Sequence, residues 1–179
     1  NSYEGLCEYV GGKYISYTEE HPITMNPFRI KREEYNVEKI GFLKNLIMLI
    51  WKGSDGTITK TEDKLIEQTI TEYYENYFNG KIKSLSFNTF YEFSVETIPR
   101  ICRDNNLTGI DIASFDFLMK GFYKGGNYEL TLNEDLDTTL FDETFIVFEI
   151  DSIKDNPLLF PIVTLIIMDL FIQKMRIKK

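Results

Sequence analysis

Three consecutive segments in the middle of the chain carry apolar side chains at helical spacing, and this pattern constrains the fold more than any other feature. The first predicted helix begins at Asn36, a favourable N-cap, and runs to about Trp51. The second opens with a capping-box pair, Thr59 and Glu62, and presents one broad apolar face. The third covers about residues 88–104. The middle of the chain is therefore predicted to be an α-helical body.

Strand-like patterns lie on both sides of these helices. Residues 13–18 alternate polar and apolar side chains, and residues 127–132 are a further candidate strand. Residues 145–150 form a nearly continuous apolar run, as expected of a buried central strand. Within the third helix, Pro99 is expected to break or kink the backbone, with Thr97 as a possible new cap. Helices and strands together predict an α/β fold.

The last helix is predicted from Asn156 or Asp155 to about Arg176. Its apolar stretch, residues 158–172, is 15 residues long and contains Asp169. A membrane-spanning helix needs about 20 predominantly apolar residues. We therefore expect this helix to pack against the sheet rather than cross a bilayer.

Composition excludes several classes of function. The 14 Phe, 11 Tyr and 1 Trp can fill a sizeable core, which is incompatible with a disordered chain. The net charge is −8, and residues 61–153 alone carry 18 acidic and 7 basic side chains. The aromatics between Tyr73 and Phe93 lie in this acidic region, so we expect no direct nucleic-acid binding by this chain. One His and two Cys exclude a zinc site built from three histidines or from paired Cys-x-x-Cys motifs.

Motifs that carry chemistry are weakly represented. The sequence has no G-x-x-x-x-G-K-[ST], and its Gly-rich stretches, residues 11–14 and 121–128, lack a Ser or Thr after the lysine. The run FIVFEID ends in Glu149 and Asp151, which flank one residue and share a face, so they are not an adjacent acidic pair. His21 has no patterned nucleophile around it and is interpreted as a loop residue.

Four stretches together resemble one family. They are SYEGLCEYVGGKYISY with PITMNPF, then FNTFYEFS, FYKGGNYE, and FDETFIVFEIDSIKDNPLLFPIVTLIIMDLFIQKMRIKK. In this order they resemble the TraG-type conjugation ATPases of conjugative transposons, which are relatives of the VirB/TraC-type ATPases of type IV secretion.

This resemblance implies a RecA-like P-loop ATPase domain with a mostly α-helical insertion. Residues 1–35 are expected to be sheet elements, residues 36–122 the insertion, and residues 123–179 the return to the sheet with its packing helix. The family's P-loop and acidic Mg²⁺-binding strand have no counterpart here, so no catalytic and no metal-binding residue is assigned in this chain. The sheet edges near Asn26 and Asp151 are the candidates for any nucleotide affinity that this chain retains by itself.

The resemblance also implies a biological setting. The parent protein is expected to bind ATP and Mg²⁺, while no cofactor is expected for this chain by itself. Its partners are expected to be other secretion-apparatus subunits and further copies in a hexamer, on the cytoplasmic side of the inner membrane. Because the chain starts without Met and stops directly after an apolar helix, we expect a piece of a larger ATPase that powers conjugative DNA transfer and is inactive alone.

Two other interpretations stay open on the residues alone. One is a stand-alone acidic helical module that docks basic proteins. The other is a different α/β enzyme that uses Glu149 and Asp151 as acid and base.

Overall fold

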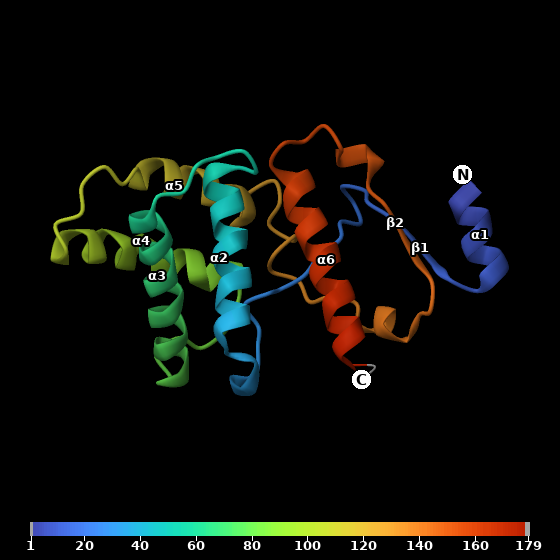
Figure 1. Ribbon diagram of the computed structural model, residues 1–179, viewed down its shortest axis with the longest axis horizontal. Helices are drawn as coiled ribbons and strands as arrows, with labels where there is room; N and C mark the ends of the chain where they lie inside the picture. Colours follow the sequence, from blue (N-terminus) through green and yellow to red (C-terminus); the bar gives the residue numbers. More distant parts are fainter. Residues whose placement is uncertain (1, 178–179) are drawn as a thin grey trace. The chain divides into compact units, whose positions relative to one another are not determined.

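The computed structural model describes residues 2–177, which form two compact units. Unit 1 comprises Asn1–Met25 and Asp135–Lys179, and unit 2 comprises Asn26–Glu134. Figure 1 shows the order of the elements. Their bounds are α1 Ser2–Val10, β1 Lys13–Ser16, α2 Val37–Lys52, α3 Lys60–Phe78, α4 Phe87–Asp104, α5 Ile112–Met119, β2 Ile146–Glu149 and α6 Leu159–Ile177. Short 3-10 helices cover Arg32–Glu34, Lys120–Phe122, Thr138–Asp142 and Asp151–Ile153.

Each α-helix of unit 2 begins at a side chain that accepts a hydrogen bond from the first turn. These N-caps satisfy backbone N–H groups that have no partner within the helix. At α3 the cap is reciprocal, because Glu62 also accepts from the backbone of Thr59. The caps of α2, α3, α4 and α5 are Asn36, Thr59, Ser86 and Asp111. The predicted starts of α2 and α3 are thus confirmed.

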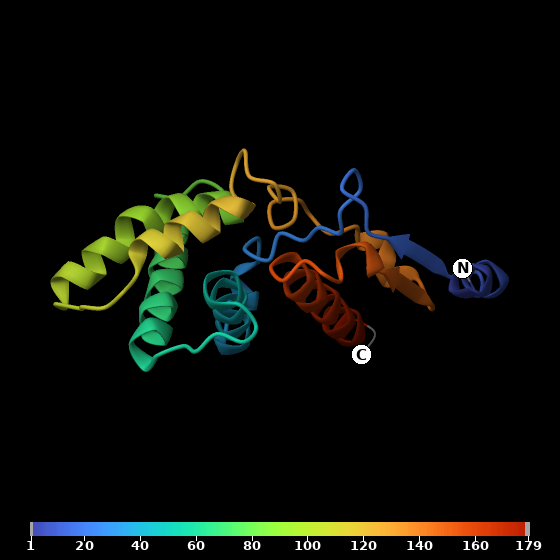
Figure 2. The same ribbon diagram turned by 90° about the horizontal axis from the view of Figure 1, so that it is seen from above.

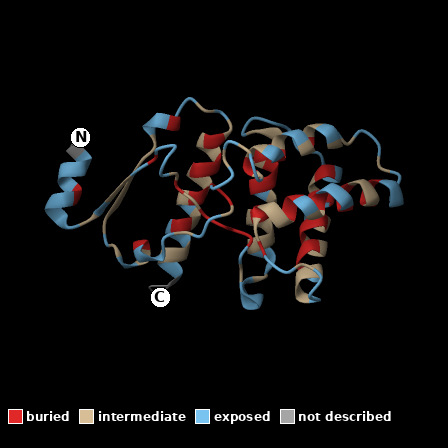
Figure 3. Cartoon of the chain, turned by 180° about the vertical axis from the view of Figure 1, so that it is seen from behind, coloured by how far each residue is buried: buried red, intermediate tan, exposed pale blue. Residues whose placement is uncertain are grey.

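An aromatic cluster in the core of unit 2 joins rings on α3 and α4 to Phe28, which lies outside the α-helices. Helix α3 packs against α2 and α4, while α5 packs against α2 and α4. The ring of Phe28 stacks on Phe90 at 4.9 Å and meets Tyr73 edge-on at 5.9 Å. The Tyr74 hydroxyl donates to the Phe28 carbonyl at 2.9 Å. Figure 3 shows the buried positions in red along these helices. The extended segment before α2 is therefore part of the helical core.

Two local predictions in unit 2 are wrong, namely a helix break at Pro99 with a new cap at Thr97, and a strand at residues 127–132. Helix α4 continues through Pro99, and Thr97 is a buried helical residue rather than a cap. The flanking Ile98 and Ile101 are buried, so tertiary packing holds the turn that proline disfavours. Residues 127–132 form turns instead of a strand. Alternation alone did not produce a strand there, because no neighbouring strand pairs with this segment among the described residues.

Unit 1 contains a two-stranded parallel sheet. Strands β1 and β2 are in register from Lys13 opposite Ile146 to Ser16 opposite Glu149. Helix α1 packs on both strands. Figures 1 and 2 both show the strands between α1 and α6. The strand predicted at 145–150 is confirmed, but all four residues of β2 are half-exposed rather than buried, because only one strand flanks it among the described residues.

Helix α6 buries one face and exposes another. Its buried residues recur at helical spacing and are Leu159, Ile162, Val163, Ile166 and Leu170. The ring of Phe171 meets that of Phe148 on β2 edge-on at 6.0 Å. The predicted packing of this helix against the sheet is therefore observed at that contact. Among the described residues, no helix is both long enough and apolar enough to span a bilayer.

Candidate functional site

The carboxyl ends of β1 and β2 lie side by side. In open parallel sheets, ligands bind at the carboxyl ends of the strands. Glu149 Oε1 accepts a hydrogen bond from the backbone N–H of Asp151 at 2.8 Å. The Ser152 hydroxyl donates to the carbonyl of Tyr17 at 3.0 Å, which ties the ends of the two strands together. One oxygen of Glu149 is therefore engaged in local structure. Within residues 2–177, no three His, Cys, Asp or Glu side chains are grouped to hold a metal ion.

A groove of about 890 Å³ runs along β2. Its walls come from α1, both strands and the start of α6, and they are mostly aromatic or aliphatic. Three charged side chains line it, namely Glu149, Asp151 and Lys154. Lys154 Nζ lies 3.7 Å from Asp151 Oδ1, and both side chains are exposed. The groove thus offers an apolar wall with an exposed ion pair near one end, and Asp151 is available to solvent there.

The two Gly-rich stretches have backbone amides that are already used. The N–H of Gly12 donates to the Cys7 carbonyl at 2.8 Å, which closes the end of α1. The N–H of Gly126 donates to the Tyr123 carbonyl at 2.8 Å, and that of Gly125 to Glu129 at 3.1 Å. A phosphate loop needs N–H groups that point together at the anion. The two Gly-rich stretches therefore do not fit a nucleotide phosphate.

Asn26 lies in unit 2, whereas Asp151 lies in unit 1. The Asn26 side chain is buried, and its Oδ1 accepts from the N–H groups of Phe28 and Arg29 at 3.2 and 3.3 Å. Its Nδ2 donates to the Leu85 carbonyl at 2.9 Å. These bonds fix the entry of the chain into unit 2. A contribution of Asn26 or Asp151 to residual nucleotide affinity of this chain stays a prediction.

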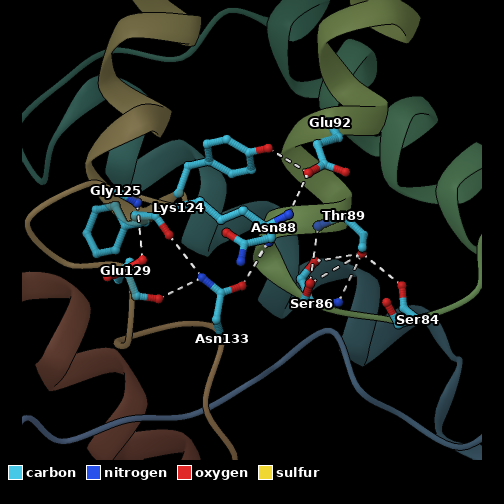
Figure 4. A network of polar contacts seen from close by, with 11 residues as sticks. Ser84, Ser86, Asn88, Thr89, Glu92, Lys124, Gly125, Glu129 and Asn133 are labelled. Carbon is cyan, nitrogen blue, oxygen red and sulfur yellow. Dashed lines mark hydrogen bonds and ion pairs between the residues drawn. The ribbon is translucent and has the colours of Figure 1, made fainter.

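A polar cluster centred on Asn133 brings together two of the stretches singled out in the sequence. Figure 4 shows Asn133 between the start of α4 and the loop 122–129. Its Oδ1 accepts from the backbone N–H of Asn88 at 2.8 Å. Its Nδ2 donates to the carbonyls of Phe122 and Glu129 at 3.0 and 2.8 Å. Asn133 therefore caps a free amide in the first turn of α4 and holds the loop at the same time.

A second set of bonds joins the same loop to α4. Glu92 Oε1 accepts from the Tyr123 hydroxyl at 2.5 Å and from Lys124 Nζ at 3.3 Å. The bond from Tyr123, aided by Lys124, lowers the pKa of Glu92. The same bond raises the pKa of Tyr123 to about 12. At neutral pH the tyrosine is thus a protonated donor and the glutamate an ionised acceptor, which suits a structural clamp rather than a proton-transfer pair.

Both ends of unit 2 are fastened at one place. Asn26, at its start, bonds to Leu85, and Asn133, near its end, bonds to Asn88. The short segment 85–88 immediately precedes and begins α4. The sequence analysis missed this arrangement, because an asparagine carries no periodic signal and its partner lies 45 or more residues away. The only local signal was at Asn133, which directly follows the candidate strand at residues 127–132.

Comparisons with known proteins place the whole chain in one group. The model of the TraG P-loop domain family matches residues 1–179. The fold is similar to that of VirB4 of Thermoanaerobacter pseudethanolicus, with a TM-score of 0.51 and 20% sequence identity. That similarity covers 86% of this chain and 41% of the VirB4 chain. Among curated protein sequences none matches. The chain thus spans less than half the length of the VirB4 structure that it resembles.

Proposed function

The chain belongs to the TraG P-loop domain family, and on this basis we propose that it is part of a conjugation or type IV secretion ATPase. The family match over all 179 residues is the observation that carries the proposal. A mixed α/β fold with a parallel sheet, similar to VirB4, supports it. The two strands with α1 and α6 are then part of a RecA-like sheet, and unit 2 contains the proposed helical insertion at residues 36–122.

In this proposal the ATPase activity belongs to a longer protein. The sequence has no P-loop motif, and the amides of its Gly-rich stretches are used internally. Phosphoryl transfer depends almost wholly on positioning and charge stabilisation, so a chain without these groups has no appreciable rate. The proposed parent protein binds ATP and Mg²⁺ and forms a hexamer of identical subunits. It contacts other secretion-apparatus subunits at the cytoplasmic face of the inner membrane and powers DNA transfer.

A phosphate-release assay tests the proposal. We compare the 179-residue chain with a polypeptide extended in both directions, each with and without Asp151→Ala. The exposed Asp155→Ala is the matched control. Turnover is expected only in the extended polypeptide and is unchanged by either substitution. Turnover by the 179-residue chain that disappears with Asp151→Ala contradicts the proposal and makes β2 the metal-binding strand.

A second measurement addresses DNA. The proposal assigns DNA transfer to the assembled machine and no direct DNA contact to this chain. The net charge of −11 over residues 61–153 opposes the phosphate contacts on which such binding depends. A fluorescence titration with single-stranded and duplex DNA at physiological salt is expected to show only background binding. Submicromolar, salt-sensitive affinity contradicts this part of the proposal.

A further inference from the structure

One edge of strand β2 is open, because within residues 2–177 this strand pairs only with β1. The carbonyls of Phe145 and Glu149 point toward β1, where they accept from N–H groups at 2.8 and 2.9 Å. Backbone groups alternate between the two edges of a strand, so those of Ile146 and Phe148 point away from β1. Open edges are usually protected by proline, by lysine or by a β-bulge. The run FIVFEI has neither residue, and the register of β2 with β1 is unbroken, so this edge is a template for a further strand.

The groove along β2 gives this edge apolar walls. Every residue from Phe145 to Asp151 lines the groove. Tyr3 and Leu6 line it from α1, and Phe160 lines it from α6. These two helices lie on opposite sides of the strands (Figures 1 and 2). A strand that is enclosed on both faces is a nearly continuous apolar run. The groove therefore fits an extended segment of about five residues with apolar side chains on both faces.

Both ends of β2 are bordered by acidic side chains. Asp142 and Glu143 precede the strand, and Asp151 and Asp155 follow it. Lys154 is the one basic residue in this part of the sequence, and it is already paired with Asp151. A segment with Lys or Arg at each of its ends complements these charges in either chain direction, whereas a segment with acidic ends is repelled.

We propose that the open edge of β2 is a peptide-docking site. It takes, as a third strand, an extended segment of a partner protein in which about five apolar residues are flanked at both ends by Lys or Arg. Hydrogen bonds to the backbone of Ile146 and Phe148 supply the affinity, the groove walls select the apolar residues, and the acidic borders select the basic ends. The inference concerns a surface rather than ATP hydrolysis, so the phosphate-release assay and the experiment below can fail independently of each other.

Fluorescence anisotropy with labelled synthetic peptides measures docking on the 179-residue chain. The probe peptide KKVIVIVKK is expected to bind saturably. The peptide EEVIVIVEE is expected to bind at least ~10-fold more weakly, because its acidic ends meet the acidic borders of β2. The peptide KKVIPIVKK keeps the basic ends but loses a central backbone donor, so it is expected to bind at least ~10-fold more weakly as well. This third peptide separates strand pairing from the attraction of any basic peptide to an acidic protein.

Ile146→Pro tests the edge on the protein side. Its N–H points away from β1, so proline removes a donor from the open edge and leaves the pairing with β1 in place. The variant is expected to bind KKVIVIVKK at least ~10-fold more weakly than the wild type does. Circular dichroism and thermal melting check that it is folded.

Charge reversal at the two borders gives a test that misfolding cannot imitate. The quadruple variant D142K/E143K/D151K/D155K is expected to bind EEVIVIVEE more tightly than KKVIVIVKK, because both borders are then basic. The control E75K/E96K changes the net charge as much as either pair does, at exposed positions in unit 2. This control is expected to keep the peptide preference of the wild type.

Hydrogen exchange locates the bound peptide. The N–H groups of Ile146 and Phe148 are expected to exchange at least ~10-fold more slowly when KKVIVIVKK is bound, because they then donate to the peptide. The N–H of Val147 faces β1 and is expected to change less. Protection confined to residues away from β2 contradicts the proposal.

Four binding results also overturn the proposal. The first is a wild-type chain that does not bind KKVIVIVKK or binds EEVIVIVEE equally well. The second is a folded Ile146→Pro variant that binds the probe as the wild type does. The third is binding to the 179-residue chain but not to a polypeptide extended in both directions, because the edge is then covered by its own flanking sequence. The fourth is a wild-type dimer that the probe does not dissociate and that Ile146→Pro abolishes, because the occupant is then a second copy.

Discussion

Unit 2 closes a core of its own, whereas unit 1 leaves much of its apolar surface uncovered. In unit 2 the rings of Phe28, Tyr73 and Phe90 are fully buried and contact one another. In unit 1 both strands are half-exposed or exposed, and two helices carry exposed apolar stripes. Parallel sheets are normally covered on both faces. The difference indicates that unit 2 is stabilised by a closed core of its own, while unit 1 leaves part of its apolar side-chain surface exposed.

Among the substitutions that test this contrast, Tyr73→Ala is expected to lower the free energy of unfolding most. Tyr73 is 0% exposed, and its hydroxyl lies 2.7 Å from that of Thr89. Burial raises the pKa of Tyr73 to about 12, so the hydroxyl stays protonated near neutral pH. Truncation leaves a cavity, and the free energy of unfolding is expected to fall by ~3–5 kcal/mol. Tyr9→Ala, on the exposed face of α1, is expected to change it by less than ~0.5 kcal/mol. Chemical denaturation followed by circular dichroism measures both, and equal losses would remove the contrast.

Gly126→Ala is expected to have the next largest effect. A Cβ on Gly126 would lie 2.3 Å from the Lys120 carbonyl oxygen and 2.6 Å from that of Gly121. Both atoms are backbone, so the loop must shift, at a cost of about 1–3 kcal/mol. In the same unit, Gly41→Ala meets nothing within 4 Å and lies inside α2, so it is expected to be neutral or stabilising. Thermal melting compares the two, and a Gly126→Ala melting temperature at or above that of the wild type contradicts the close approach.

Glu62→Gln tests the partly buried ion pair between Glu62 and Lys52 in unit 2. The Glu62 side chain is buried and contacts Lys52. Burial raises the pKa of Glu62, but the bonds from Lys52 and Thr59 outweigh it and leave the pKa below its ordinary value of 4.5. The substitution is expected to cost about 1–2 kcal/mol at pH 7. Glu67→Gln, which weakens the more exposed pair with Lys44, is expected to cost less than ~0.5 kcal/mol.

The difference in unfolding free energy between the wild type and Glu62→Gln is expected to depend on pH with a definite sign. The folded pKa of Glu62 lies below the unfolded one, so its contribution is complete above the unfolded value and is lost as the pH falls through the folded value. Urea denaturation at neutral pH and at pH values below 4.5 is therefore expected to show the wild type and Glu62→Gln converging in acid. A gap that stays constant down to the lowest pH would show that the lost group acts through packing instead of charge.

Gly5→Ala is the smallest expected effect and concerns unit 1. Gly5 lies inside α1, and a Cβ there meets nothing within 4 Å. Alanine in a helix interior is favoured over glycine by roughly 0.5–1 kcal/mol. Helicity by circular dichroism is expected to rise slightly, with no loss of thermal stability. A destabilised protein would mean that another surface already lies against α1.

The helices were predictable from the sequence because their signals are local. Asn36, Thr59 and Glu62 mark helix starts through neighbours three residues away, and apolar spacing shows the buried face. The strand at 146–149 was also predictable, but its exposure was not, since the number of neighbouring strands is not encoded in the strand itself. The failed strand at 127–132 shows the same limit, because alternation needs a partner strand to become a sheet.

The candidate site was less predictable than the fold. Asp151 was found by its place after an apolar run, and the structure puts it at an exposed strand end. Asn26 was named for an expected place near a sheet edge, but it is buried in unit 2, and its bond to Leu85 joins residues 59 positions apart. The cluster around Asn133 depends in the same way on contacts that only the folded chain creates. Long-range hydrogen bonds by single polar side chains leave no pattern in the sequence.

The fastening of both ends of unit 2 at residues 85–88 has a topological consequence. The chain enters this unit at Asn26 and leaves it just after Asn133, and both asparagines bond to the same short segment. Because both asparagines are held at the same segment, the chain enters and leaves unit 2 at two closely spaced points. The unit is therefore an insertion with neighbouring ends in the chain that forms unit 1, which is its host. Units of this kind can be gained, lost or exchanged between related proteins without redirecting the host's strands. Lengthening α3 or α4 within the unit likewise leaves the host's backbone path unchanged.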